Sequence, residues 1–343
     1  MAYLVRRKDT HVLRLLLLPV VLVMAIRGAH RYKTENPCSC LLSAMLSYYV
    51  IAKSLEFAFA ERGRFKVGEK KFVVIYEPTA DSAKDSRRHG WILPIWLVDP
   101  IEHLSALCKG RRVGLRSRHF RPGPYTRPSQ RNAFLRATAL SVVRSFVLLD
   151  FYYSCIRLIP GAGTLTGGTI FPEHLSPLQR YAVSTGVHFA MGMLIMYGVG
   201  LVHDFNTMLA VGLLGHPPSA WPPVHDSPWK ARSLHEFWAK RWHQGLRRVF
   251  VVTGGSVGTW IAGNAGMVIG TFLVSGLFHE LSMYSFGRGL DHCTTLWFTL
   301  QGFGIVLEKV WKMLTGRKIG GVWGRLCTVL FVIVFGQMFR SDE

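Results

Sequence analysis

A single histidine in a long apolar stretch is the first candidate for chemistry in this sequence. His279 lies within residues 272–282, with aliphatic and aromatic neighbours on both sides. Desolvation keeps an imidazole neutral, so His279 is a candidate general base. The alternative is a structural histidine that is hydrogen-bonded to a neighbouring helix, for example through Ser275 or Ser282. Glu280 lies roughly 100° further around a helix, so we expect it to cap a loop or pack elsewhere.

A second candidate, His243, lies in an aromatic and basic segment 36 residues earlier. The segment 233–244 begins with a serine suited to an N-cap, and Glu236 is the third residue after it. On a helix, one face would carry the charged and polar side chains Glu236, Lys240, His243 and Arg247. An adjoining face would carry the aromatic side chains Phe237, Trp238 and Trp242. This pattern predicts an amphipathic helix in the membrane interface. His243 is then either an interfacial histidine or a participant in chemistry.

The elements that position these histidines are apolar runs of membrane-spanning length. A bilayer core of roughly 30 Å takes about 20 helical residues. The clearest runs are 181–202, where His188 is the only titratable side chain and is interpreted as structural, and 249–278, which has no charged residue or histidine over 30 positions. Weaker runs are 12–26, 38–60, 134–159, 293–307 and 322–339. The sequence therefore predicts an all-α polytopic membrane protein with six to eight crossings.

Two glycine pairs divide the run 249–278. Residues 249–262 would reach roughly 21 Å at about 1.5 Å per residue, which is too short to cross. We therefore expect a partial or interfacial helix there, followed by one true span over 264–286. The run 12–26 follows three basic residues but is not followed by a small-residue cleavage pattern, which favours a retained anchor over a signal peptide.

Basic residues are concentrated in the loops. The chain of 343 residues has 41 Lys and Arg against 20 Asp and Glu, for a net charge of +21. Such a charge first suggests nucleic-acid binding, but the mean hydropathy of +0.22 and the segregation of charge from apolar runs exclude it. Residues 103–149 hold ten basic residues and no acidic one, and 230–248 hold six basic residues and one acidic one. Both loops are predicted to face the cytosol, because two crossings separate them.

Metal and disulfide chemistry have no support in the cysteine pattern. The six cysteines (Cys38, Cys40, Cys108, Cys155, Cys293 and Cys327) show no metal-ligand spacing. No internal repeat or low-complexity tract divides the chain, so residues 1–343 are predicted to form one membrane-embedded domain.

Motifs around both histidines resemble a known family. They are Trp221-Pro222-Pro223, Ser227-Pro228-Trp229, Ser233-Leu234-x-Glu236-Phe237-Trp238-x-x-Arg241-Trp242-His243-Gln244, and His279 in Ser-Gly-Leu-Phe-His-Glu. Further similar motifs are Gln301-Gly302-x-Gly304-Ile305-Val306-Leu307-Glu308 and Gly320-Gly321-Val322-Trp323-Gly324-Arg325-Leu326. Together they resemble the wax-synthase-like branch of the membrane-bound O-acyltransferases, in particular fungal enzymes that acetylate terpenoid alcohols. The resemblance is specific over 221–335, the expected catalytic region, and the segment 109–114 is only weakly similar.

The resemblance implies a helical bundle around a chamber that admits acyl-CoA from the cytosol and a lipophilic alcohol, such as a terpenoid, from the membrane. His279 matches the family's base. His243 matches its second polar position, often Asn or Asp, which would hold the donor or the developing oxyanion. No metal, resident cofactor or covalent acyl-enzyme is implied, because neither Ser275 nor a cysteine lies in a nucleophile–base motif. Acetyl-CoA is the expected co-substrate, and the endoplasmic reticulum is the expected membrane.

Basic and aromatic side chains near His243 are the expected substrate-binding residues. CoA carries several phosphate charges, which Arg and Lys bind well. Lys240, Arg241 and Arg247 are the candidates for them, although the same residues could instead bind anionic lipid. Trp238, Trp242 and Ser275 are the remaining candidates for substrate binding. The alternatives to an acetyltransferase are a long-chain wax-ester synthase and a non-catalytic lipid- or isoprenoid-binding membrane protein.

Overall fold

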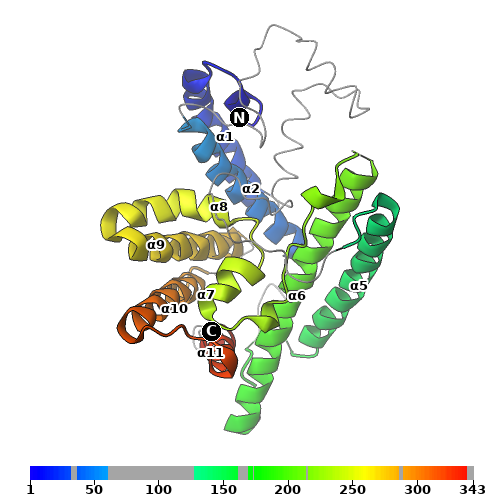
Figure 1. Cartoon of the computed structure of the whole chain (residues 1–343), viewed down its shortest axis with the longest axis vertical. Helices are drawn as coiled ribbons and strands as arrows, with labels where there is room; N and C mark the ends of the chain where they lie inside the picture. The colour runs from blue at the N-terminus through cyan, green and yellow to red at the C-terminus, as the bar shows by residue number, and fades with distance from the viewer. Residues whose placement is uncertain are drawn as a thin grey trace.

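Helices make up most of the structure, a computed structural model that describes residues 1–31, 37–60, 127–160, 169–172, 174–213, 215–285 and 289–337. The long helices are α1 (His11–Arg31), α2 (Pro37–Ala58), α5 (Arg131–Arg157), α6 (Pro177–Gly212), α9 (Ser256–Ser285) and α10 (Cys293–Thr315) (Figure 1). Short α-helices are α7 (Leu234–Glu236), α8 (Arg247–Phe250), α11 (Gly321–Val329) and α12 (Phe335–Gln337). Three π-helical segments, η4 (Phe237–Arg241), η5 (Val251–Gly255) and η6 (Leu330–Val334), and three 3₁₀ turns, η1 (Leu4–Arg6), η2 (Pro218–Ala220) and η3 (Pro228–Lys230), complete the elements. No β-strand occurs in these described ranges, which confirms the all-α prediction.

Several helices have the length and composition of membrane spans. Within the described residues these are His11–His30, Arg131–Arg157, Pro177–Gly212 and Arg247–Ser285, with Gly321–Val334 as a shorter apolar helix. They coincide with the runs predicted from the sequence, and α2 and α10, of 22 and 23 residues, coincide with two more. The prediction of a polytopic membrane protein is confirmed, and the count of six to eight crossings stays a prediction.

The run 249–278 folds into a tight helical hairpin. The chain leaves helical geometry at Ala262 and Gly263, where Gly263 has a φ of 55°, and α9 then runs back beside α8, η5 and its own first turns (Figure 1). A side chain on Gly258 would overlap the carbonyl oxygen of Gly266, so the two arms touch through their backbones. The predicted short helix and following span are therefore both present, and the span carries His279.

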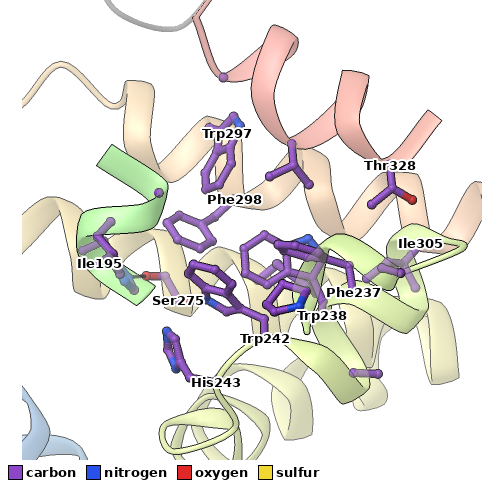
Figure 2. Close-up of a pocket in the computed structure, with 18 of the residues that line it drawn as sticks. Ile195, Phe237, Trp238, Trp242, His243, Ser275, Trp297, Phe298, Ile305 and Thr328 are labelled. Atoms are coloured by element: carbon purple, nitrogen blue, oxygen red, sulfur yellow. Dashed lines mark hydrogen bonds between the residues drawn. The ribbon is translucent and has the colours of Figure 1, made fainter. Parts of the chain in front are cut away.

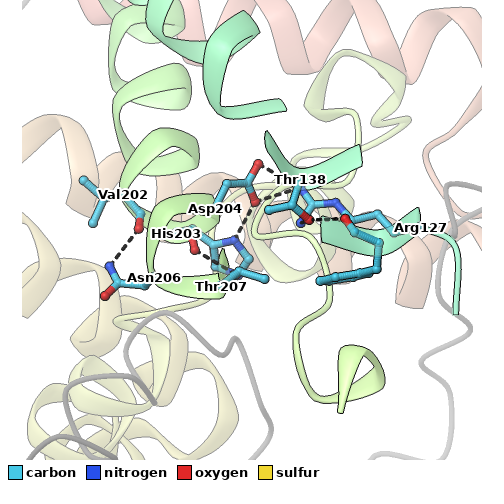
Figure 3. A network of polar contacts seen from close by, with 8 residues as sticks. Arg127, Thr138, Val202, His203, Asp204, Asn206 and Thr207 are labelled. Atoms are coloured by element: carbon cyan, nitrogen blue, oxygen red, sulfur yellow. Dashed lines mark hydrogen bonds and ion pairs between the residues drawn. The ribbon is translucent and has the colours of Figure 1, made fainter. Parts of the chain in front are cut away.

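A buried polar cluster ties the start of α5 to the adjacent helix α6. Arg127 donates from Nη2 to both carboxylate oxygens of Asp204, at 2.7 and 2.8 Å (Figure 3). The Nδ1 of His203 lies 3.1 Å from the Oδ1 of the same carboxylate. Thr138, on α5, lies beside the guanidinium group. Because carboxylate and guanidinium are paired inside apolar surroundings, the cluster sets how α5 and α6 pack.

Two glutamates link the elements that carry the candidate site. Glu280, directly after His279, accepts hydrogen bonds from the backbone N–H groups of His292 at 2.6 Å and Thr295 at 2.9 Å, at the beginning of α10. The expectation that Glu280 caps a neighbouring segment is confirmed. Glu308, on α10, in turn accepts from the backbone N–H groups of Leu234 and His235 at the beginning of α7. The carboxylates satisfy otherwise unpaired helix donors, and they fix α9, α10 and α7 relative to one another.

Candidate active site

The segment that leads to His243 is only briefly α-helical. Ser233 caps α7 as predicted, because its Oγ accepts a hydrogen bond from the N–H of Glu236 at 3.0 Å. The chain then changes to the π-helix η4 and ends its helical geometry at Trp242. Phe237 is buried and stacks on Trp242, with ring centroids 5.5 Å apart. The prediction of one amphipathic helix over this segment was therefore wrong, because the α-helix is only three residues long and helical geometry ends before His243. Its location in the membrane interface stays a prediction.

Gln244 shapes the turn that carries His243. Its Nε2 donates to the carbonyl oxygens of Trp238 at 2.8 Å and Trp242 at 2.7 Å, which closes the chain into a loop after η4. Its Oε1 accepts from Arg247 at 3.3 Å. The loop presents the His243 ring to the interior, against Trp242 at a centroid distance of 5.5 Å.

His243 stays neutral in this environment. Burial lowers its pKa from the usual value to about 3, and the nearby rings of His225 and His279 further oppose a positive charge. His225, whose ring lies 6.0 Å from that of His243, likewise has its pKa lowered to about 4, chiefly by burial. A neutral imidazole carries one N–H donor and one acceptor nitrogen. His243 can therefore donate a hydrogen bond without carrying charge.

The ring of His279 is fixed in one tautomer. Its Nδ1 lies 2.8 Å from the carbonyl oxygen of Ser275, one turn earlier on α9. A carbonyl only accepts, so Nδ1 carries the proton and Nε2 keeps the lone pair. The ring packs on Phe298 with centroids 4.6 Å apart, and its Nε2 has no hydrogen-bond partner among the described residues. Of the two serines named for the structural alternative, Ser275 contacts His279 through its backbone carbonyl on the same helix, whereas Ser282 donates to the carbonyl oxygen of Phe278.

Both histidines line one cavity of about 850 Å³. Aromatic rings form much of its wall, among them Trp238, Trp242, Trp297 and Phe298 (Figure 2). The side chain of Ser275 also faces this space. A largely apolar chamber with two imidazoles suits a reaction that needs a base, a hydrogen-bond donor and little water.

The other predicted binding residues divide into two groups. Trp238, Trp242, Arg247 and Ser275 line the cavity, whereas Lys240 and Arg241 do not. Arg241 donates to the Oε1 of Glu236 from both Nε and Nη2, at 2.9 and 2.7 Å, and to the carbonyl oxygen of Asp226. Although burial acts to raise it, the pKa of Glu236 is held below its ordinary value by the N–H of Arg232 and by Arg241. Arg241 thus supports the fold of this segment.

Among the lining residues that were not predicted site residues are three basic or titratable ones, His235, Lys309 and Arg325. Lys309 and Arg325 are exposed and belong to the cavity wall, so they mark where the cavity reaches the surface of the protein. The pKa of His235 is lowered first by burial and then by Lys309, Lys240 and Arg247, so positive charge gathers at this opening. The basic cluster after residue 308 was visible in the sequence, but its distance from His235 was not. His188, expected to be structural, also lines the cavity.

Some of the predictions from the sequence concern residues that the structure does not describe. The weakly similar segment 109–114 and most of the basic loop 103–149 lie outside the described residues, as does Cys108. Within the described ranges, no group of three or more His, Cys, Asp and Glu side chains is arranged to hold a metal ion.

Comparison with known proteins identifies the region that holds the site. Residues 221–300 match the profile described as the membrane bound O-acyl transferase family. The chain is 27% identical over 227 residues to acetyltransferase aurG of Calcarisporium arbuscula, covering 60% of this chain and 55% of that protein. It is 30% identical over 193 residues to O-mevalon transferase yanI of Aspergillus niger, covering 48% of this chain and 41% of that protein. A probable long-chain-alcohol O-fatty-acyltransferase 6 of Arabidopsis thaliana is 29% identical over 132 residues, which is 35% of this chain and 38% of that protein.

The matches have a limited extent. No solved structure matches the chain significantly. The chain spans about half the length of the first two curated relatives. The matched region 221–300 nevertheless contains His243, His279 and the cavity-lining Trp238, Trp242 and Trp297. Through residues 221–300, this chain is similar to the membrane bound O-acyl transferase family.

Proposed function

We propose that this protein transfers an acyl group, preferably acetyl, from acyl-CoA to the hydroxyl group of a lipophilic alcohol such as a terpenoid. The observation that carries the proposal is the fixed tautomer of His279, whose Nε2 lone pair shares a cavity with the neutral ring of His243. Relatives described as acetyltransferase and O-mevalon transferase support acyl transfer to oxygen. The protein would act as a multi-pass protein of the endoplasmic reticulum membrane.

The reaction follows from the two rings. The Nε2 of His279 takes the proton of the bound alcohol while the alcohol oxygen attacks the thioester carbonyl carbon. The N–H of His243 donates to the carbonyl oxygen as negative charge develops there. The C–S bond then breaks, and the proton held by His279 passes to the leaving thiolate, so that an ester and free CoA result. General-base catalysis contributes about 10² to 10⁴ in rate, and the rest comes from orientation in a dry cavity.

The charged opening is the proposed entrance for the donor. Arg247, Lys309 and Arg325 line it, and neither Lys309 nor Arg325 has an ion-pair partner among the described residues. Phosphate groups of CoA match these cations, and the acyl end would extend toward the histidines. Lys240, Arg241 and Arg247 were the candidates from the sequence, and the geometry favours Arg247 together with the two residues from α10 and α11.

Long-chain ester synthesis is the second candidate. A cavity of about 850 Å³ has room for more than an acetyl group, and a relative is described as acting on long-chain alcohols. This candidate differs from the first only in the length of the acyl chain and the alcohol.

The test is ester formation by purified protein in lipid nanodiscs. Acetyl-CoA and palmitoyl-CoA are supplied separately, each with farnesol, ergosterol or hexadecanol, and products are identified by mass. We expect an acetyl ester and free CoA in equal amounts. A palmitoyl ester in place of an acetyl ester would support the second candidate. No ester from any pair, with the protein folded, would contradict both and support a non-catalytic lipid-binding protein.

A further inference from the structure

A buried glutamine on α10 connects three parts of the molecule. Gln301 has no exposed surface, although it lies in a largely apolar helix. Its Oε1 accepts a hydrogen bond from the indole Nε1 of Trp238 at 3.2 Å, and its Nε2 donates to the carbonyl oxygen of Phe331 at 3.2 Å. A buried amide is costly unless both its ends are bonded. Here one end holds a side chain of the cavity wall and the other holds the π-helix η6.

The indole that Gln301 holds is central to the cavity wall. Trp238 lines the cavity, and its ring lies 5.9 Å from that of Phe298. Phe298 in turn packs on His279 at 4.6 Å. Gln301 and Phe298 are three residues apart on α10, so they share one face of the helix. Trp238 is also part of the loop that Gln244 closes around His243. The hydrogen bond from Trp238 to Gln301 therefore attaches the His243 segment to the helix face that contacts His279.

The same hydrogen bond keeps the part of the wall formed by Trp238 apolar. With its N–H directed to Gln301, Trp238 presents ring carbons to the cavity. An unpaired indole N–H would instead attract water or turn toward the cavity. Water near the thioester matters, because it competes with the alcohol for the acyl group.

We propose that Gln301 is a positioning residue for acyl transfer: by fixing the indole of Trp238, it sets the separation of His243 and His279 and keeps water away from the donor. The proposal rests on the acyltransferase function proposed above. It predicts that the loss of Gln301 changes two quantities that a purely structural residue does not change: turnover per folded molecule, and the fraction of donor that is hydrolysed.

The first experiment replaces Gln301 by Leu in nanodisc-embedded protein. We expect kcat per mole of monodisperse protein to fall by about 10- to 100-fold, as for a displaced catalytic group. The KM for acetyl-CoA should change less, because the charged opening is untouched. The ratio of free CoA released to ester formed should rise above one, which reports hydrolysis.

The matched control is Gln337→Leu. Gln337 is also a buried glutamine in a helix, and its Nε2 donates to Thr185 at 2.7 Å, but Thr185, unlike Trp238, does not line the cavity. Its loss should lower thermal stability in the same way and leave the ratio of CoA to ester at one. An equal rise of that ratio in both variants would overturn the proposal.

A second variant separates the hydrogen bond from packing. Trp238→Phe keeps an aromatic ring and removes the N–H donor. If the bond carries the effect, Gln301→Leu should lower kcat less in the Trp238→Phe background than in the wild-type background. An equal fold-decrease of kcat in both backgrounds would overturn the positioning role. So would a Gln301→Leu variant with unchanged kcat and an unchanged ratio of CoA to ester. In either case, ester formation by the wild-type protein would leave the proposed function standing. A wild-type protein that forms no ester would overturn both.

Discussion

His203 on α6 and His279 on α9 each have a ring nitrogen next to an oxygen acceptor, and of these two histidines only His279 lines the cavity. His203, on α6, is 2% exposed and lies beside Asp204, which Arg127 holds (Figure 3). His279, on α9, is bonded to a backbone carbonyl and lines the cavity. By residue type, the Asp204–His203 pair resembles a catalytic dyad more closely than His279 does.

Access to the second ring nitrogen separates the two histidines. The Nε2 of His203 is buried, has no partner among the described residues and is not part of the cavity wall. The Nε2 of His279 belongs to a ring in the wall of a chamber large enough for substrates. The comparison teaches that a favourable partner orients an imidazole, whereas open space beside its free nitrogen makes chemistry possible.

The largest effect on turnover is expected from His279→Ala. We expect the protein to remain folded and membrane-inserted, and turnover to fall by about two to four orders of magnitude, because the general base is lost. The measurement is ester formed per mole of monodisperse protein. Near-normal specific activity with a reduced yield of protein would mean that His279 is structural and would rule out the proposed mechanism.

The opposite result is expected from Asp204→Ala. Removing one partner of the buried ion pair leaves the charge of Arg127 uncompensated, which costs about 3 to 5 kcal/mol of stability. Specific activity of the surviving protein should remain near normal, because the cluster does not line the cavity. Replacing Arg127 by Met and Asp204 by Leu together should recover much of the stability. A loss of turnover without a loss of stability would instead assign a catalytic role to Asp204 and His203 and would contradict this comparison.

A third histidine, His243, is distinguished by the protonation state of its ring. Its pKa of about 3 keeps the ring neutral at all ordinary pH values. An unfolded histidine has a pKa near 6.5, so the contribution of His243 to stability is complete above about pH 6.5 and is lost as pH falls toward 3. We expect His243→Ala to lower turnover by about 10²-fold, as for the loss of an oxyanion donor.

The matched variant for that experiment is His243→Asn, whose amide N–H should retain part of the activity. In both the wild type and this variant, the pH profile of kcat should show no step that belongs to residue 243 between pH 5 and 8. A step near pH 6.5 that disappears in His243→Asn would contradict the neutral ring.

The smallest effect is expected at the basic residue Lys309 in the cavity wall. Lys309→Gln should raise the apparent KM for acetyl-CoA by roughly five- to tenfold and leave the KM for the alcohol unchanged, because a charge-assisted contact to phosphate is lost and salt screens it. Arg241→Gln is the paired comparison: it should lower stability through Glu236 and leave both KM values close to wild type. A larger rise in the KM for acetyl-CoA in Arg241→Gln than in Lys309→Gln would contradict this result and support Arg241 as the CoA-binding residue, as expected from the sequence.

Several features were predictable because they depend on residues close together in the chain. The cap at Ser233, the break near Gly263 and the capping role of Glu280 all follow from spacing and residue type within a few turns. The conversion of the segment after Glu236 into a π-helix was not predictable. It depends on Gln244 bonding back to Trp238 and on the indole of Trp238 reaching α10.

The sequence by itself determined that the chain is helical, that it is embedded in a membrane, and that His279 lies in apolar surroundings. These properties follow from composition, length and periodicity, which need no long-range contact. Only the tertiary structure decided which cations face the cavity. Arg241 turns to Glu236, five residues away, whereas Lys309 and Arg325 come from distant helices to the opening beside His235. It also decided which histidine is open to substrate, because the space beside a ring nitrogen is made by side chains from helices far apart in the sequence.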